Sequence, residues 1–308
     1  MLTAFDSIPA RDRVIVALDC DAWEAIALAD KLEGHAKWLK IGMTLYYAEG
    51  PAIVKMFKRR GFNVFLDLKF HDIPHQVQGA ARSAAASGAD MLTMHTVGGR
   101  AMMEAAQRGA ELGAADAGRS VPATLGITVL TSMDAGALAE TGVTRPLTDQ
   151  VAALAELARL SGISGVVASP LEAAMLRETL GPDAFIVTPG VRPAGAELGD
   201  QSRVMTPAEA FRAGSSHIVV GRPITQAPDP VVVDEGSATS VLDSYTAADA
   251  APNSVDRARR WAENGGIPWM AVPWDRETLG SALGRSTCAM AALTDQGLAE
   301  ALARKLAD

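Results

Sequence analysis

The sequence has few of the features that mark secreted, membrane-spanning or nucleic-acid-binding proteins. It contains two cysteines, Cys20 and Cys288, which are too few for a disulfide framework and are typical of reduced thiols in a cytosolic protein. No apolar run approaches the roughly 20 residues that span a membrane. Residues 1–13 include charges but no apolar core of signal-peptide length. We therefore expect a soluble protein of the cytoplasm.

A basic region is also missing. The 308 residues carry a net charge of -8 without a block of like charges, so we expect neither nucleic acid nor an anionic membrane as a partner. An anionic substrate would instead need a local positive site. Hydrophobic residues make up 48% of the chain and charged residues 21%, a balance that is typical of globular proteins and excludes a disordered chain.

Eight short β-rich runs alternate with longer amphipathic stretches. The predicted strands cover residues 14–18, 37–41, 63–68, 90–95, 123–129, 165–168, 184–188 and 217–220. Several of them are apolar almost throughout, as expected for strands that are covered on both faces. The repeated alternation predicts an α/β fold in which parallel strands close into a TIM (β/α)8 barrel. An open, doubly wound sheet is the second possibility, but no Gly-x-Gly-x-x-Gly turn follows the first strand.

The stretches between the strands have the apolar periodicity of helices. Predicted helices cover residues 23–32, 51–60, 148–160, 170–180 and 207–213. Thr148 is expected to cap the third of these helices, and Gly61, Gly181 and Gly214 stand at the expected ends of three others.

After residue 230 the character of the sequence changes. We expect residues 1–230 to form the barrel core and residues 231–292 to form an insertion that packs on the barrel or extends from it. The first part of the insertion, 231–253, is rich in Ser, Ala, Asp and Thr and is predicted to be a loop or linker. Residues 293–308 are predicted to contain the final barrel helix, capped by Thr294. Three of the five tryptophans lie in the insertion, so a partner-binding element is the alternative.

Charged residues lie at the predicted C-terminal ends of the first three strands, where barrel enzymes carry their working residues. They are Asp19, Lys40, Asp67 and Lys69. Because Asp67 and Lys69 are two residues apart, both are predicted to face the barrel mouth, while the apolar residues beside them face the other way. A lysine beside carboxylates stays protonated, and in a dry pocket it can act as a general acid. Taken alone, however, an Asp-x-Lys pair is more often a structural ion pair.

The residues around this pair overturn the structural interpretation. Segment 67–74, Asp-Leu-Lys-Phe-His-Asp-Ile-Pro, resembles the signature of the orotidine 5'-phosphate decarboxylases. Further matches to that family lie, in the same order and at strand ends, at residues 16–19, 39–42, 130–133, 188–193, 199–201 and 220–225. The resemblance covers residue 1 to about residue 230 and is to the longer, bacterial branch of the family. It implies a barrel enzyme that decarboxylates orotidine 5'-phosphate to uridine monophosphate (UMP), the last step of de novo pyrimidine biosynthesis.

The resemblance also implies catalytic roles. Lys69 would protonate the carbanion that remains at C6 of the pyrimidine when carbon dioxide leaves. Asp67 and Lys40 would hold Lys69 in a charged network. Asp72 would complete that network in the neighbouring subunit's site, so the expected assembly is a homodimer.

Substrate binding is implied for an overlapping group of residues. Asp19 and Lys40 would bind the ribose hydroxyls, and Asp67 belongs to the same substrate-binding set. Thr131 would contact the amide edge of the pyrimidine.

A phosphate site can be inferred independently, because barrel enzymes often bind phosphate with the loops after strands 7 and 8. Here those loops supply Arg192, Gln201, Gly221 and Arg222. An arginine offers a fork that matches phosphate oxygens, and a glycine lets its backbone N–H approach them closely. Taken alone, Arg222 could equally form a surface salt bridge.

No cofactor and no metal are expected. His71 and His75 are four residues apart across Pro74, which is not a helical ligand pair, and zinc sites usually have three or four clustered ligands. Two other functions stay open: a magnesium-dependent decarboxylase or aldolase of the same superfamily that acts on sugar phosphates, and a non-catalytic nucleotide-binding barrel. The pair Thr131-Ser132 and segment 199–201 favour the nucleotide enzyme over the first of these.

Overall fold

The chain folds into two compact units, Met1–Val233 and Asp234–Asp308. The computed structural model describes residues 3–192, 205–227, 243–246, 269–271 and 290–293. Of the first unit it describes a complete barrel, and of the second a small sheet.

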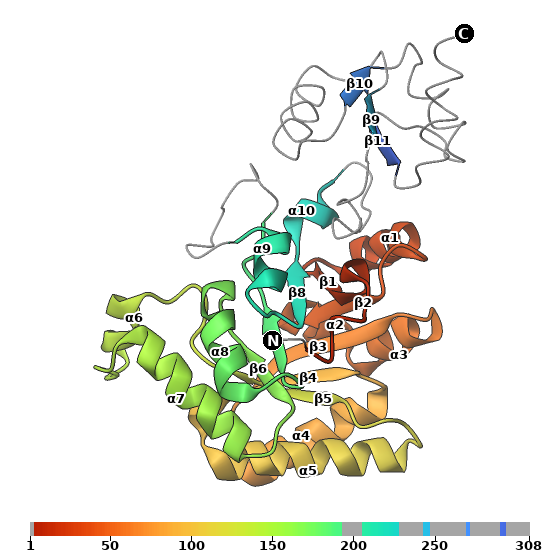
Figure 1. Ribbon diagram of the computed structural model, residues 1–308. Coiled ribbons are helices and arrows are strands. Elements are labelled where there is room, and N and C mark those ends of the chain that lie inside the picture. The colour runs from red at the N-terminus through yellow and green to blue at the C-terminus, as the bar shows by residue number, and fades with distance from the viewer. Residues whose placement is uncertain (1–2, 193–204, 228–242, 247–268, 272–289, 294–308) are drawn as a thin grey trace. The chain divides into compact units, whose positions relative to one another are not determined.

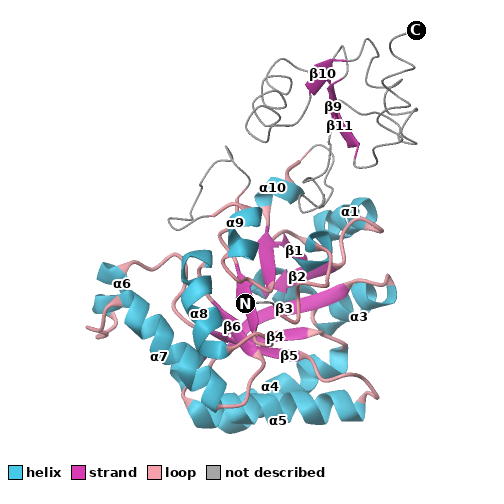
Figure 2. Ribbon diagram, viewed as in Figure 1, coloured by secondary structure: helices cyan, strands magenta, loops and turns pink. Residues whose placement is uncertain are grey.

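The first unit is a closed barrel of eight parallel strands, in which β1 pairs with both β2 and β8 (Figure 1; Figure 2). In chain order the strands are β1 (Val14–Leu18), β2 (Trp38–Gly42), β3 (Asn63–Phe70), β4 (Met91–His95), β5 (Ala123–Ile127), β6 (Gly165–Val167), β7 (Phe185–Thr188) and β8 (His217–Val220). Each agrees with its predicted range to within two residues at either end. The TIM (β/α)8 barrel predicted from the sequence is confirmed.

Helices cover the outside of the barrel (Figure 2). They are α1 (Ala22–Leu32), α2 (Met43–Glu49), α3 (Pro51–Arg59), α4 (Pro74–Ser87), α5 (Arg100–Asp116), α6 (Ala135–Glu140), α7 (Leu147–Leu160), α8 (Ala173–Leu180), α9 (Pro207–Arg212) and α10 (Arg222–Thr225), with 3-10 turns η1 (Ala10–Arg13), η2 (Thr96–Gly98) and η3 (Pro170–Glu172). Among the described residues, none of the helices is long and apolar enough to cross a membrane.

Two predicted helix starts are wrong. Helix α7 begins at Leu147, with Pro146 as its N-cap and without a side-chain cap, so Thr148 lies inside the first turn. Pro146 has no N–H to leave unsatisfied, so a proline suits the start of a helix. The predicted helix 170–180 is divided into η3 and α8, and the Ser169 capping box belongs to η3.

The second unit contains a three-stranded sheet of β9 (Asp243–Thr246), β10 (Trp269–Ala271) and β11 (Met290–Leu293), in the order β10-β9-β11. Strand β10 is parallel to β9, and β11 is antiparallel to it. The prediction of a loop over 231–253 is therefore wrong at β9. Both partners of β9 lie far along the chain, so local composition could not reveal the pairing. The final helix predicted from Thr294 onward lies outside the described residues.

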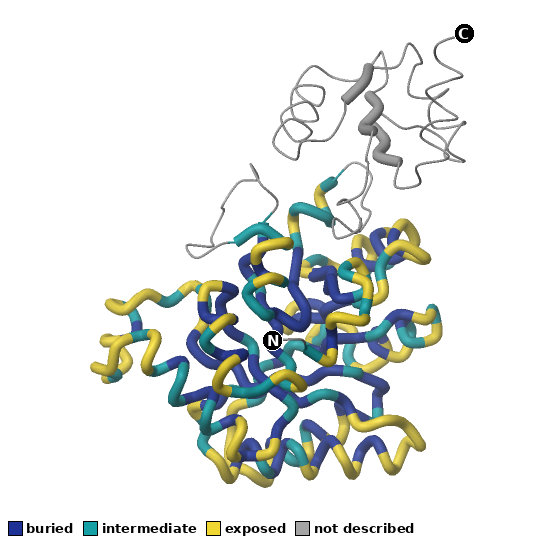
Figure 3. The backbone as a smooth tube through the Cα atoms, in the orientation of Figure 1, coloured by how far each residue is buried: buried dark blue, intermediate teal, exposed yellow. Residues whose placement is uncertain are grey.

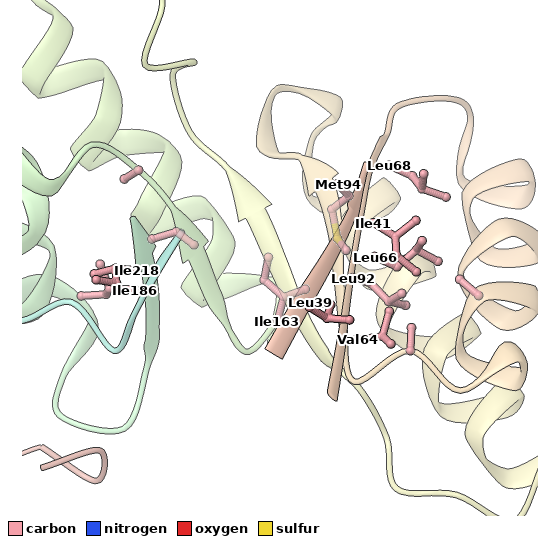
Figure 4. Packing of buried hydrophobic residues seen from close by; sticks show 14 of the residues in the cluster. Leu39, Ile41, Val64, Leu66, Leu68, Leu92, Met94, Ile163, Ile186 and Ile218 are labelled. Atoms are coloured by element: carbon pink, nitrogen blue, oxygen red, sulfur yellow. The ribbon is translucent and has the colours of Figure 1, made fainter. Parts of the chain in front are cut away.

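The barrel has two apolar layers, which explains why its strands are apolar almost throughout. Alternate strand residues fill the interior, namely Ile15, Ala17, Phe65, Met91, Leu125, Val187 and Val219. The residues between them, such as Leu39, Ile41, Leu66 and Leu92, pack in the layer between strands and helices (Figure 4). Burial is concentrated along the strands and the inner faces of the helices (Figure 3). Apart from histidines, the eight barrel strands therefore carry few ionisable side chains, namely Lys40 on β2 and Asp67 and Lys69 on β3.

Helices α4 and α5 approach each other so closely that glycine is required at their contact. A Cβ at Gly109 would overlap the backbone carbonyl oxygen of Gln78, and one at Gly113 would overlap that of Arg82. Because the obstacle is backbone and not the end of a flexible side chain, a shift of the whole helix would be needed. The rest of the contact is made largely of alanines, which permit the same close approach.

Replacing Gly109 by alanine should lower the free energy of unfolding by about 1–3 kcal/mol, because overpacking forces the two helices apart. Gly79→Ala is the matched control: Gly79 lies in α4, and nothing is within 4 Å of an added Cβ. That variant should gain up to about 1 kcal/mol from helix propensity. Urea denaturation of both variants measures the difference, and equal stabilities would contradict the proposed helix contact.

His217 lies at the start of β8, buried among three aromatic rings. The ring centroids of Phe5, Trp38 and Phe185 lie 5.7, 5.4 and 5.6 Å from that of His217. Burial, with a smaller contribution from the charge of Arg13, lowers the pKa of His217 to about 3. The folded protein therefore holds this imidazole neutral through the physiological range.

Stability should consequently decrease on acidification. The folded-state pKa lies below the ordinary value of 6.5, so His217 contributes stability above pH 6.5 that is lost as the pH falls toward 3. Between pH 7 and pH 5 this loss is about 2 kcal/mol. Urea denaturation at the two pH values should show that His217→Phe lacks this part of the loss, whereas exposed His35→Phe keeps it. The same loss in wild type and His217→Phe would refute a buried neutral imidazole.

Candidate active site

A cavity of about 620 Å³ opens at the C-terminal ends of the barrel strands. Most of its lining residues come from β1, β2, β3, β5, β6, β7 and β8 or directly follow these strands, while Glu24 and Leu28 come from α1 and Thr225 from α10. The polar and charged residues in the lining are Asp19, Cys20, Glu24, Lys40, Asp67, Lys69, Thr131, Arg192, Arg222, Thr225 and Gln226. The strand ends thus bring together residues that are far apart in the sequence.

Four of these residues form a chain of alternating charge across β1, β2 and β3. Lys40 Nζ lies 2.8 Å from Asp19 Oδ1 and 3.8 Å from Asp67 Oδ2. Asp67 Oδ2 also accepts a hydrogen bond of 2.8 Å from Lys69 Nζ. The side chains of Lys40 and Asp67 are only 10% and 12% exposed, so water screens their attraction weakly. Lys69, at 26%, is the more accessible ammonium and faces the cavity.

Lys69 reaches this position through an irregular backbone and not through simple strand alternation. Strand β3 advances four residues, Leu66 to Phe70, while β4 advances two, Leu92 to Met94. Within this bulge Lys69 has a φ of 52°, the only positive φ of a non-glycine residue in the part of the chain that the structure describes. Such a conformation is costly for a residue with a Cβ, so the surrounding structure must impose it.

Thr93 of β4 is a further site residue, and it was not predicted from the sequence. Its Oγ1 accepts a 2.9 Å hydrogen bond from the Lys69 backbone N–H and donates one of 2.9 Å to Asp67 Oδ1. Thr93 is fully buried and does not line the cavity. The available signal was a single hydroxyl in an otherwise apolar run, Met-Leu-Thr-Met, one strand away from the Asp-x-Lys pair.

The structure describes three of the four residues that are predicted to bind phosphate. Arg192, Gly221 and Arg222 line the cavity, whereas Gln201 lies outside the described residues. The Arg192 backbone N–H donates to the Met205 carbonyl, and its guanidinium Nη1 donates to the Val191 carbonyl, each at 2.9 Å. The first of these bonds holds the start of the segment after β7 against Met205, two residues before α9, and the second is a local contact between chain neighbours.

Thr131 lines the cavity as expected, but Asp72 does not. Asp72 is exposed, and its Oδ1 accepts a 2.6 Å hydrogen bond from the backbone N–H of Ile73. Within one chain, the structure therefore brings Asp19, Lys40 and Thr131 to the same cavity as the Asp67–Lys69 pair and leaves Asp72 apart from it.

The pKa values of two further titratable groups, Cys20 and His95, are shifted toward the neutral form. Burial, followed by the charges of nearby carboxylates, raises the pKa of Cys20 to about 11, so this thiol is a poor nucleophile at neutral pH. The pKa of His95 is lowered, first by burial and then by His71 and Lys69. Among the residues that the structure describes, no three His, Cys, Asp or Glu side chains are grouped to hold a metal ion.

This arrangement suits chemistry in which negative charge develops on a bound anion. The Lys69 ammonium can stabilise such charge and donate a proton to it, because Asp67 fixes the position of Nζ. Arg192 and Arg222 place two guanidinium groups in the cavity lining of a chain whose net charge is -8.

Comparison with known proteins agrees with this geometry. Residues 12–235 match the family described as "Orotidine 5'-phosphate decarboxylase / HUMPS family". The orotidine 5'-phosphate decarboxylase of Moorella thermoacetica is 51% identical over 234 residues, covering 75% of this chain and 93% of the relative. That of Halorhodospira halophila is 49% identical over 236 residues, covering 76% and 98%.

The chain is also similar to a solved structure from the same family. The crystal structure of orotidine 5'-phosphate decarboxylase from Lactobacillus acidophilus superposes with a TM-score of 0.65 at 41% identity, covering 71% of this chain and 94% of that one. The matched region contains the whole barrel and every predicted site residue. The chain therefore belongs to the orotidine 5'-phosphate decarboxylase / HUMPS family.

Proposed function

We propose that this chain decarboxylates orotidine 5'-phosphate to UMP, the last step of de novo pyrimidine biosynthesis, without a metal or cofactor. The observation that carries the proposal is the alternating chain Asp19–Lys40–Asp67–Lys69 at the base of a cavity that also contains two arginines. The relatives named orotidine 5'-phosphate decarboxylase, at about 50% identity over nearly their whole length, support the same reaction.

In the proposed reaction the bond between C6 and the carboxylate carbon breaks, and its electron pair stays on C6 as carbon dioxide leaves. The Lys69 ammonium lies beside the developing carbanion and stabilises it electrostatically. A proton then passes from Lys69 Nζ to C6, which completes UMP and leaves a neutral amine that solvent reprotonates. Asp67 holds Nζ in place throughout, since their hydrogen bond is 2.8 Å long.

The remaining predicted residues bind the unreactive parts of the nucleotide. Asp19 and Lys40 are proposed to bind the ribose hydroxyls, and Thr131 the amide edge of the pyrimidine, which is supported by their place in the cavity lining. Lys40 is also in contact with Asp67, so ribose binding and the charged network share one side chain.

Arg192, Gln201, Gly221 and Arg222 are proposed to bind the phosphate. Their loops follow β7 and β8, the usual place for phosphate in this fold. A dianionic phosphate far from C6 offers binding energy that the enzyme can use to exclude water and to align the ring above Lys69.

Lys69→Ala should reduce turnover by about 1,000-fold or more, because it removes both the stabilising charge and the proton donor. The loss of ultraviolet absorbance of orotidine 5'-phosphate, followed with excess chelator, measures this. Lys55→Ala is the control, since Lys55 is an exposed lysine on α3 and should leave turnover unchanged.

Three results would contradict the proposal. A well-folded wild-type protein that does not turn over orotidine 5'-phosphate would refute the proposal. Magnesium-dependent activity on sugar phosphates would favour the sugar-phosphate decarboxylase or aldolase of the same superfamily. Tight binding of UMP without turnover would favour a non-catalytic nucleotide-binding barrel.

A homodimer in which Asp72 completes the partner's site is part of the proposal. Large apolar side chains are exposed in the segments that follow β2, β3 and β4, on the same side of the barrel as Asp72. They are Met43, Tyr47, Ile73 and Val97, which are 46%, 76%, 63% and 55% exposed. One of them, Ile73, is the neighbour of Asp72 in the chain, and exposed large apolar side chains are typical of interfaces between subunits.

Subunit mixing tests the shared site. Lys69→Ala and Asp72→Ala should each be inactive alone, but a heterodimer of the two contains one intact site. Statistical mixing by co-expression should therefore restore about a quarter of wild-type activity. The control is a mixture of Lys69→Ala with Asp67→Ala, which should stay inactive because both residues come from the same chain. Full activity of Asp72→Ala alone, or no recovery on mixing, would exclude the shared site.

Two further predictions from the sequence are separate from this proposed reaction. One is the division into a barrel core over residues 1–230, an insertion over 231–292 and a final helix within 293–308. The other is the cytoplasmic location, together with the absence of nucleic acid and membranes as partners.

A further inference from the structure

The hydrogen bonds of Thr93 connect the backbone of Lys69 to its side-chain partner. The Lys69 N–H cannot join the regular ladder, because β3 carries two extra residues relative to β4 at this point. Thr93 Oγ1 accepts a hydrogen bond from this N–H and donates one to Asp67 Oδ1, while Asp67 Oδ2 accepts one from Lys69 Nζ. The two bonds of the Thr93 hydroxyl, which we term the Thr93 bridge, close a ring through both ends of Lys69.

Thr93 is oriented toward the barrel interior, opposite to its neighbours. Leu92 and Met94 lie with Leu66 and Leu68 in the apolar layer between strands and helices (Figure 4). Side chains alternate along β4, so Thr93 points the other way. Its exposed fraction is 0%, and the cavity is lined without it. Thr93 therefore does not touch a ligand in the cavity, and any effect that it has on the chemistry must pass through Asp67 and Lys69.

We infer that Thr93 is a positioning residue for decarboxylation. The Thr93 bridge fixes Lys69 in its left-handed backbone conformation and turns the Asp67 carboxylate so that its second oxygen holds Nζ. Without the hydroxyl, the Lys69 N–H and Asp67 Oδ1 would each lose a buried partner, which is costly and is relieved by a backbone change. Lys69 would then return to negative φ and carry Nζ away from the substrate. This inference rests on the proposed decarboxylase function.

The test compares Thr93→Val, which keeps the shape and removes both hydrogen bonds, with Thr93→Ser, which keeps the hydroxyl. Turnover number, KM and the dissociation constant of UMP are measured for each. Thr93→Val should lower kcat by about 100-fold, as expected for a misplaced catalytic group. Its KM and UMP affinity should change little, because the contacts of the ribose and phosphate are untouched. Thr93→Ser should restore most of kcat.

Thr124→Val is the matched control. Thr124 is also fully buried in the barrel, and its hydroxyl also accepts from a backbone N–H, that of Ser164, and donates to a side chain, that of Gln107. Gln107 lies on α5, so this hydroxyl faces the helices and not the interior. Thr124→Val should lose thermal stability to a similar extent as Thr93→Val but keep its kcat. A kcat for Thr93→Val equal to that of Thr124→Val, or a Thr93→Ser variant as impaired as Thr93→Val, would overturn the inference.

A crystal structure of Thr93→Val separates failure of this inference from failure of the proposed function. The φ of Lys69 and the distance from its Nζ to Asp67 Oδ2 are read directly, whether or not the wild-type protein turns over orotidine 5'-phosphate. A negative φ and a broken contact support the positioning role. A φ still near 52° with the 2.8 Å contact intact overturns it.

Discussion

The site depends on one carboxylate, that of Asp67, which lies between two ammonium groups and is largely shielded from water. Without it, Lys40 and Lys69 would be neighbouring like charges in the barrel mouth, and Lys69 would lose its ion pair while Lys40 kept only that with the exposed Asp19. Asp67 therefore makes it possible for the fold to place a reactive cation where a substrate can reach it. Asp19 and Thr93 hold the two ends of this arrangement from neighbouring strands.

The barrel could be predicted from the sequence because strands that lie between two apolar layers are apolar at consecutive positions. Every residue of β1 is buried on one face or the other, so the strand is apolar throughout and easily found. Helix starts are less predictable, because Pro146 and Thr148 are both acceptable caps and only the path of the chain decides between them. Strand β9 could not be predicted, since its pairing depends on partners distant in sequence.

Within the site, what could be predicted were residues whose place follows from the strand end on which they lie. Asp19, Lys40 and Asp67 reach the cavity for this reason, whereas Lys69 reaches it through the bulge in β3. The bulge in β3 could not be predicted, because it depends on the register against β4, and for the same reason Thr93 was missed. Asp72 is different, because its proposed role lies in the site of a second subunit. Within one chain its side chain only accepts a hydrogen bond from the neighbouring Ile73 N–H.

The two ends of the barrel differ in the ionisable groups that they bury. One end holds a neutral histidine and the other holds paired charges, and this difference helps to explain how a stable fold can contain a strained site. At one end His217 is kept neutral among aromatic rings, so its burial requires no charged partner. At the other end, charges are kept and paired, and Lys69 adopts an unfavourable φ. Such strain persists only where surrounding contacts over-determine the backbone. Strand β3 is paired with β2 and β4 in the closed ladder, and the Thr93 hydroxyl holds the Lys69 N–H, so both restrain the backbone at Lys69.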